Sequence, residues 1–289
     1  PDEPSYMVNY GLLLAQQGDS LRAAEFLQRA AALDPNWSRG HAQLGELALA
    51  SGQIDEAEQR FKTALRADPD DAHAKVGLAQ ISQVRGDTDK ALALAQEAIA
   101  DLPKDARAQS VLGTILLAKG HTAFARQALD NALALEPKNR RIQRMAARAR
   151  LADNDAAEAM ALVRRMLDFD AEDLPMLAEL CDQALARQLY AELIDVLDRA
   201  LVRVPHEPRL IHAAAEARAR SGRIDDAISL LGAYSSAEAH PSIWAHRLGL
   251  LAQRKRYDDA FELAQAWVAA QPQHADAQAE LATGADFAS

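Results

Sequence analysis

The sequence predicts an all-α protein built from tandem two-helix repeats, and three observations carry this prediction. A set of glycine, alanine and proline residues recurs at a fixed spacing of 34 residues through the first half of the chain. Apolar residues make up 49% of the chain but aromatic residues only 5%, a balance that favours closely packed helices over a β-rich core. Glycines and prolines fall between the helix-like segments, where they act as boundaries.

The repeated set has five positions, and it is found four times in succession. The four copies are Gly11, Gly18, Ala23, Ala30 and Pro35; Gly45, Gly52, Ala57, Ala64 and Pro69; Ala79, Gly86, Ala91, Ala98 and Pro103; and Gly113, Gly120, Ala125, Ala132 and Pro137. Agreement of this kind at a constant period indicates a repeated structural unit.

Each repeated position has a physical role in a helix–turn–helix unit. The second position of each set, which is glycine in all four copies, follows one helix and is suited to the left-handed conformation of a helix C-terminus. Asp19 and Asp87 come directly after such glycines and can cap the next helix. The alanines allow two helices to approach closely, and the proline ends the second helix because it cannot continue the hydrogen-bond ladder.

This pattern resembles the tetratricopeptide repeat family, as the second unit shows with Leu44, Gly45, Gly52, Ala57, Phe61, Ala64 and Pro69. The resemblance extends from Pro4 to about His274. It implies a right-handed α-solenoid of about eight repeats, with residues 275–289 adding a partial capping helix and tail. The expected repeats are 4–37, 38–71, 72–105, 106–139, 140–173, 174–207, 208–240 and 241–274.

The later repeats depart from the pattern. Asn154 and Gln188 stand where earlier repeats have glycine, and Ala171 replaces a proline. Gly232 falls inside an expected helix, where glycine costs about 1 kcal/mol in helix propensity. The sequence therefore predicts a joint between Gly232 and Pro241.

Charge and composition exclude several classes of protein. The net charge of −10 argues against a nucleic-acid binder. No apolar run approaches the roughly 18 residues that a membrane span needs, and no secretory leader is recognised. The sequence starts at Pro1 without a methionine, so its beginning does not identify a compartment; we expect a soluble protein, cytoplasmic or periplasmic. An excess of arginine over lysine together with abundant alanine suggests a bacterial source.

The sequence contains none of the common catalytic or cofactor-binding motifs, so it predicts no enzyme, cofactor or metal. Phosphate-binding glycine loops, zinc-protease motifs and serine nucleophile elbows are missing. Cys181 is the single cysteine and takes a small position of its repeat, which favours a buried structural thiol. Paired acids such as Asp55 and Glu56 fall at helix N-termini, where they complement the helix dipole.

The resemblance implies that the first helix of each repeat lines a concave ligand-binding groove. At these positions the sequence places four apolar residues with one glutamine, and a basic set. The first group is Val8, Leu12, Val76, Val84 and Gln80, and the second is Arg107, Arg141, Arg144 and Arg148. Residues 104–152 carry a net charge of +7, while 1–103 carry −7 and 153–289 carry −10. Arg141, Arg144 and Arg148 share one helix face, since they are spaced i, i+3 and i+7.

Two functional interpretations follow. In the first, the array is a protein–protein interaction scaffold that holds an extended, acidic peptide or partner surface in its groove. The second makes it the targeting or regulatory arm of a larger bacterial enzyme, such as a glycosyltransferase or sulfotransferase, or of a polysaccharide-export protein. A plainer interpretation of the arginines, as a solvated helix face, also stands at this stage.

Overall fold

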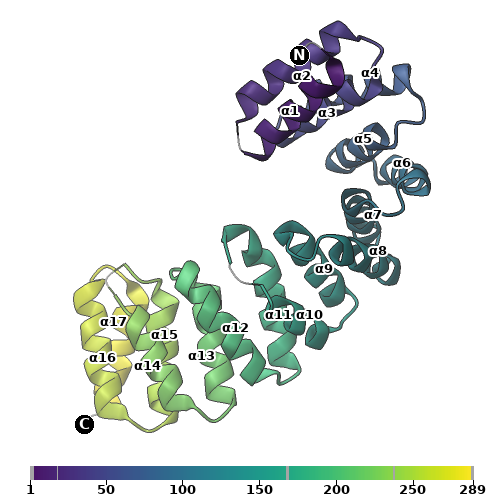
Figure 1. The fold of residues 1–289 in the computed structure, drawn as a ribbon. Helices are drawn as coiled ribbons and strands as arrows, with labels where there is room; N and C mark the ends of the chain where they lie inside the picture. The colour runs from purple at the N-terminus through teal and green to yellow at the C-terminus, as the bar shows by residue number, and fades with distance from the viewer. Residues whose placement is uncertain (1–2, 18, 167–168, 237, 288–289) are drawn as a thin grey trace. The chain divides into compact units, whose positions relative to one another are not determined.

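All regular structure in the part of the chain that we describe is helical. The computed structural model describes residues 3–17, 19–166, 169–236 and 238–287. The chain forms two units, residues 1–149 and 150–289. Figure 1 shows antiparallel helix pairs stacked side by side within each unit, as expected for an α-solenoid.

The first unit consists of four complete helix pairs and most of a ninth helix. These helices are α1 (Pro4–Gln16), α2 (Ser20–Leu33), α3 (Ser38–Ala50), α4 (Ile54–Ala67), α5 (Ala72–Val84), α6 (Thr88–Asp101), α7 (Ala106–Ala118), α8 (Thr122–Leu135) and α9 (Arg140–Ala152). In the first four repeats each first helix packs against its own second helix, and α1, α3 and α5 also pack against the first helix of the next repeat. The first helices therefore form a continuous face of the unit.

The turns between paired helices adopt the left-handed conformation that the sequence predicts. Gly52, Gly86 and Gly120 have φ values of 75°, 84° and 78°, and Asn154 takes the same conformation with φ of 64°. Gly18 lies outside the described residues. The expected aspartate caps are also present, since Asp87 Oδ1 accepts a hydrogen bond from the backbone N–H of Lys90 at 3.2 Å.

The core of the first unit is rich in alanines and contains one fully buried aromatic ring. Ala57, Ala64 and Ala91 are fully buried between helices. Phe61 on α4 is also fully buried, and its ring lies against both Gly45 on α3 and Gly77 on α5. A Cβ atom at Gly45 would lie 2.7 Å from the ring and one at Gly77 only 2.2 Å from it. Both glycines are therefore needed to accommodate Phe61.

The second unit contains the remaining helices. They are α10 (Ala156–Val163), a 3-10 turn (Ala171–Asp173), α11 (Leu174–Ala186), α12 (Tyr190–Arg203), α13 (Pro208–Arg220), α14 (Ile224–Tyr234), α15 (Pro241–Gln253), α16 (Tyr257–Ala270) and α17 (Ala275–Phe287). The last helix packs on α16 and buries Ala277.

Two second helices are shorter than the 14 residues of α4 or α12. α10 has only 8 residues, and the buried side chains of Met166 and Phe169 come after it in the chain. α14 has 11 residues and contains Gly232 in its last turn. The guanidinium of Arg247 lies where the missing side chain of Gly232 leaves room, and a Cβ there would come within 3.1 Å of Arg247 Cζ.

Among the described residues, the search for bilayer-crossing segments found no helix with the necessary length and apolar character.

Candidate functional site

The basic surface on the first helices of the first unit is our candidate site. It draws on α5, α7 and α9, which supply Gln80, Arg107 and the arginines of α9. α9 contains no acidic residue along its whole length. The charged residues of this helix are therefore all positive, and near its start the helix dipole opposes them.

Arg107 is held by two partners from earlier repeats. Its Nη1 atom forms an ion pair with Glu46 on α3, and its Nη2 atom donates a hydrogen bond to Gln80 Oε1 at 2.9 Å. About a third of the Arg107 side chain is still exposed, at 32%. Arg107 therefore contributes a partly neutralised charge, and an anionic ligand would compete with Glu46 for it.

Arg107 and Arg141 line the same depression. Its volume is about 300 Å³, and its walls also include Ser110, Thr114 and Asn139. The Thr114 hydroxyl already donates to Val111 O at 2.9 Å. The Ser110 hydroxyl and the Asn139 amide, beside two guanidinium groups, can donate hydrogen bonds to a carboxylate or phosphate. The depression also contains Glu136, whose Oε2 atom accepts a hydrogen bond from Asn139 Nδ2 at 2.7 Å.

The arginines of α9 that were expected to bind ligand differ in exposure. Arg141 and Arg148 are exposed, whereas Arg144 is half-buried. The exposed pair is separated by seven residues, so it extends roughly 10 Å along the helix. Arg141 and Arg148 are therefore the residues of this set that a ligand would reach most directly.

The apolar residues expected in the groove are not equally accessible. Val8 and Val76 are 1% and 2% exposed and belong to hydrophobic clusters between helices, so they are not part of an open surface. Leu12 is half-buried and packs against the cluster that contains Val8. Val84, by contrast, is 69% exposed. The difference arises because Val8 and Val76 point between packed helices and not toward the groove.

In the second unit, a histidine cluster lies on the first helices α13 and α15. His212 Nδ1 lies 2.9 Å from His246 Nδ1, and the two rings stack with their centroids 5.1 Å apart. His212 Nε2 is 2.6 Å from Ser242 Oγ, which is also 2.7 Å from His240 Nδ1. Burial lowers the pKa of His212 to about 4, and the neighbouring histidines contribute to this shift.

Histidine spacing along a single helix does not reveal this cluster. His212 and His246 are one repeat length apart, and that spacing is the sequence signal that could have joined them. In the described residues, no group of three or more metal-binding side chains was found.

Cys181 is buried and carries a free thiol, as the sequence predicts. Burial raises the pKa of this thiol to about 12, so it stays protonated near neutral pH and is a poor nucleophile. Its position on α11 therefore reflects packing.

Stacked antiparallel helix pairs with glycine turns and alanine contacts define the chain as an α-solenoid of helix–turn–helix repeats. Two family models, both described as tetratricopeptide repeat, match it at residues 14–81 and 48–115 and at residues 110–173 and 212–275. Together they cover well over half of the chain, so the protein belongs to the tetratricopeptide repeat family. Repeats of this family are scaffolds for protein–protein interaction and are generally not catalytic.

Solved structures show the same fold at low sequence identity. PilW, whose structure is titled as that of a widely conserved type IV pilus biogenesis factor, has a TM-score of 0.58 and 18% identity. That match covers 72% of this chain and 96% of PilW. TTC0263, a thermophilic protein of the same repeat family in Thermus thermophilus, has a TM-score of 0.50 and 21% identity, covering 63% of this chain and 99% of its own.

A larger assembly shares the fold as well. The structure of the APC/C hetero-tetramer Cut9–Hcn1 matches with a TM-score of 0.54 and 16% identity, over 94% of this chain and 47% of the other. None of the curated proteins compared with this chain matches its sequence.

Proposed function

We propose that the basic first-helix surface of the first unit binds an acidic, extended segment of a partner protein. The observation that carries this proposal is the depression lined by Arg107 and Arg141 together with hydroxyl and amide donors. An arginine offers a planar fork of donors that matches a carboxylate, which makes acidic side chains the best fit. Arg148 extends the exposed charge along α9 beyond the depression.

The charge distribution of the chain supports the same choice. The net charge is −10 overall, while residues 104–152 carry +7. A local basic region attracts an acidic segment, and the acidic remainder of the chain repels that segment elsewhere, so binding is confined to the basic region. An extended segment suits it, because the arginines are spread along a helix and not gathered at one point.

The test is charge reversal at the two exposed arginines, in the double variant Arg141→Glu and Arg148→Glu. The probe is a fluorescein-labelled peptide that alternates glutamate with serine, with binding followed by anisotropy. Two exposed ion pairs at up to ~1 kcal/mol each make about 2 kcal/mol, or roughly thirtyfold in affinity, and repulsion adds to the loss. Affinity of the unaltered protein should also decrease as salt is raised.

The matched control is Arg60→Glu and Arg66→Glu on α4, which makes the same change in net charge on a second helix. This control should bind the peptide nearly as well as the unaltered protein, and a peptide that alternates lysine with serine should bind both proteins alike, since it has no preference for the basic region. Equal weakening by both pairs of changes would show that only the overall charge matters. If neither the α9 changes nor added salt weakened binding of the peptide, these arginines would be only a solvated helix face, and the proposal would be wrong.

A further inference from the structure

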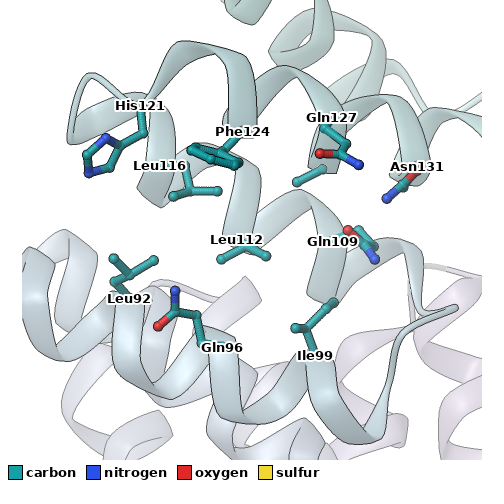
Figure 2. Close-up of a pocket in the computed structure, with 11 residues that line it drawn as sticks. Leu92, Gln96, Ile99, Gln109, Leu112, Leu116, His121, Phe124, Gln127 and Asn131 are labelled. Atoms are coloured by element: carbon teal, nitrogen blue, oxygen red, sulfur yellow. The ribbon is translucent and has the colours of Figure 1, made fainter.

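A second groove of the first unit lies between the second helices α6 and α8 and shares no lining residue with the basic depression. Figure 2 shows α6 and α8 as its walls and α7 as its floor. The groove has a volume of about 480 Å³. Leu92 and Ile99 on α6, Leu112 on α7 and Phe124 on α8 supply its apolar surface.

The groove lining contains no aspartate, glutamate, lysine or arginine, although 26% of the chain is charged. Its polar members are side-chain amides and one histidine. Gln96, Gln127 and Asn131 are exposed along its rim, while the amide of Gln109 already donates a hydrogen bond to Pro103 O at 2.9 Å. An occupant would therefore meet apolar groups in the centre and neutral hydrogen-bonding groups at the edge.

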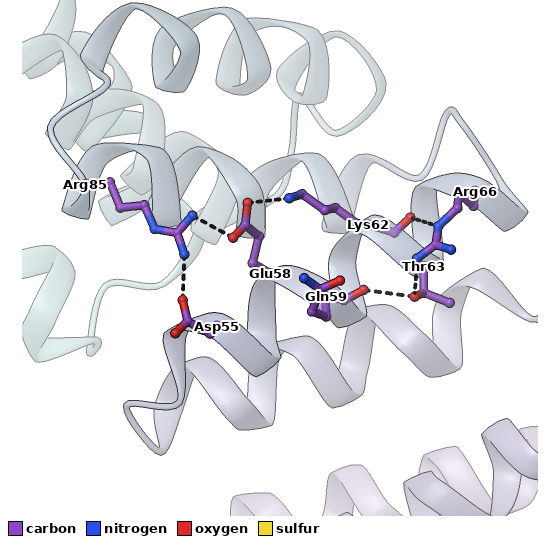
Figure 3. A network of polar contacts seen from close by, with 7 residues as sticks. All are labelled: Asp55, Glu58, Gln59, Lys62, Thr63, Arg66 and Arg85. Carbon is purple, nitrogen blue, oxygen red and sulfur yellow. Dashed lines mark hydrogen bonds and ion pairs between the residues drawn. The ribbon is translucent and has the colours of Figure 1, made fainter.

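One repeat earlier, six of the eleven equivalent positions are charged. Subtracting 34 from Leu92, Gln96, Gln109, His121, Phe124 and Asn131 gives Glu58, Lys62, Lys75, Asp87, Lys90 and Glu97. Several of these side chains satisfy one another, because Lys62 pairs with Glu58 at 2.7 Å and Lys75 pairs with Glu97 at 3.4 Å. Arg85 also donates to Glu58 at 2.6 Å, as Figure 3 shows, and with Lys62 it lowers the pKa of Glu58.

Phe124 is the clearest departure from this pattern. Its side chain is 66% exposed and, in Figure 2, its ring lies over the groove near Leu116. All seven other repeats have a charged residue at the position of Phe124. These residues are Arg22, Glu56, Lys90, Glu158, Glu192, Asp226 and Asp259. An exposed aromatic ring in place of a charge is typical of an interaction surface, since it leaves apolar area in water unless a partner covers it.

We infer that the groove between α6 and α8 docks an amphipathic helix of a partner protein through a face that is apolar and uncharged. The absence of charge in the lining sets the chemistry of that face, because a buried unpaired charge on the partner would be costly. The spacing sets its form: Leu92, Gln96 and Ile99 stand at i, i+4 and i+7, as do Phe124, Ala128 and Asn131. Each wall is roughly 10 Å long, which matches two turns of a helix lying between them.

This surface is separate from the basic first-helix surface, so the two proposals fail or succeed independently. The probe is a displayed library of short helical peptides in which the three positions i, i+4 and i+7 vary. Selection uses the unaltered protein, with counter-selection against Phe124→Lys, which restores the residue type of Lys90. The exposure of Phe124 means that this change should leave the fold intact, and thermal unfolding checks that it does.

We expect enriched peptides to carry leucine, methionine or aromatic residues at the three positions and no charge there. Their affinity should fall at least tenfold with Phe124→Lys and less than twofold with Val84→Lys, an exposed apolar site on the other face of the unit. A proline placed between the varied positions should abolish binding. Failure to enrich any peptide that depends on Phe124 would overturn the inference.

Other results would overturn it in favour of a different occupant. Charged residues at the varied positions would contradict the uncharged face. Tolerance of the proline would indicate an extended segment. Concentration-dependent dimerisation that Phe124→Lys abolishes would assign the groove to a second copy of the chain.

Discussion

At the scale of single residues, Phe61 and the two glycines beside it are the most constrained packing feature of the first unit. Other repeats place smaller side chains at the position of Phe61, such as Leu27, Ala95 and Leu129. Phe61 is compensated on both sides, by Gly45 in its own repeat and by Gly77 in the next. The ring of Phe61 therefore packs two successive repeats together through complementary shape.

We expect Gly77→Ala to destabilise the chain by roughly 1–3 kcal/mol, the usual cost of overpacking a core. The added methyl group would lie 2.2 Å from the ring of Phe61, so either the ring or α5 must move. The loss should be smaller in a Phe61→Leu background, where the ring is gone. Denaturant unfolding of the four proteins of this double-mutant cycle measures the coupling. Equal losses in both backgrounds would contradict the contact.

His212 should make stability depend on pH. Burial lowers its pKa to about 4, below the usual value of ~6.5, so the unfolded chain takes up a proton more readily between these values. Stability should therefore be highest above pH ~6.5 and should decrease as pH falls toward 4. The pKa of His246 is lowered by burial too and acts in the same direction.

The measurement is thermal unfolding from pH 7 to pH 4, with His212→Gln compared against the unaltered chain. His212→Gln should lose less stability over this range, because it removes one group that must be kept neutral in the fold. His206→Gln, at an exposed histidine in the same unit, should keep the full dependence. Identical curves for His212→Gln and the unaltered chain would remove His212 as the cause.

At the scale of elements, α14 shows why one helix of the array ends early. Gly232 occupies its last turn, and the N–H of Ser235 bonds back to Gly232 O. The Ser235 hydroxyl donates to Leu231 O at 2.7 Å and so satisfies a carbonyl that the backbone N–H of Ser235 would bond in a continuing helix. The guanidinium of Arg247 lies beside Gly232, in the space that a side chain there would need. Its Nε atom has no hydrogen-bond partner.

We therefore predict fast amide hydrogen exchange at Ala233 to Ser236 compared with α4. The double variant Gly232→Ala and Arg247→Met should slow this exchange, since alanine gains about 1 kcal/mol of helix propensity and methionine vacates the space for its Cβ. Gly232→Ala alone should slow it less, because the new methyl group meets the guanidinium at 3.1 Å. If amide exchange in this segment were as slow as in α4, the prediction of a joint after Gly232 would be wrong.

At the scale of the whole molecule, periodicity determined what the sequence could predict. The turn conformations at Gly52, Gly86 and Gly120 and the buried alanines depend on contacts inside one repeat or between neighbours, which recur with the period. The early end of α10 does not follow the period, and no local signal such as the Gly232 of α14 marks it. Met166 and Phe169, which come after α10, are buried.

The candidate site was less predictable, because its contacts skip repeats. The sequence alone predicted a basic helix at α9, with Arg141 and Arg148 on one face. Both side chains are exposed in the structure. The sequence could not predict the ion pair between Arg107 and Glu46. These residues are 61 positions apart, and their contact depends on the displacement between successive repeats. The burial of Val8 and Val76 likewise depends on the rotation of each first helix, which residue spacing determines only coarsely.

The contact between Glu46 and Arg107 also has a mechanical consequence. A repeat stack normally behaves like a spring whose coils touch only their neighbours. This ion pair joins the second repeat to the fourth, and Gln80 of the third repeat accepts a hydrogen bond from the same arginine. These contacts therefore resist the separation of three successive repeats when the stack is stretched. Tension along the first unit would separate Glu46 from Arg107 and release the arginine. By reciprocity, an anion that takes Arg107 from Glu46 would lower the stiffness of the spring.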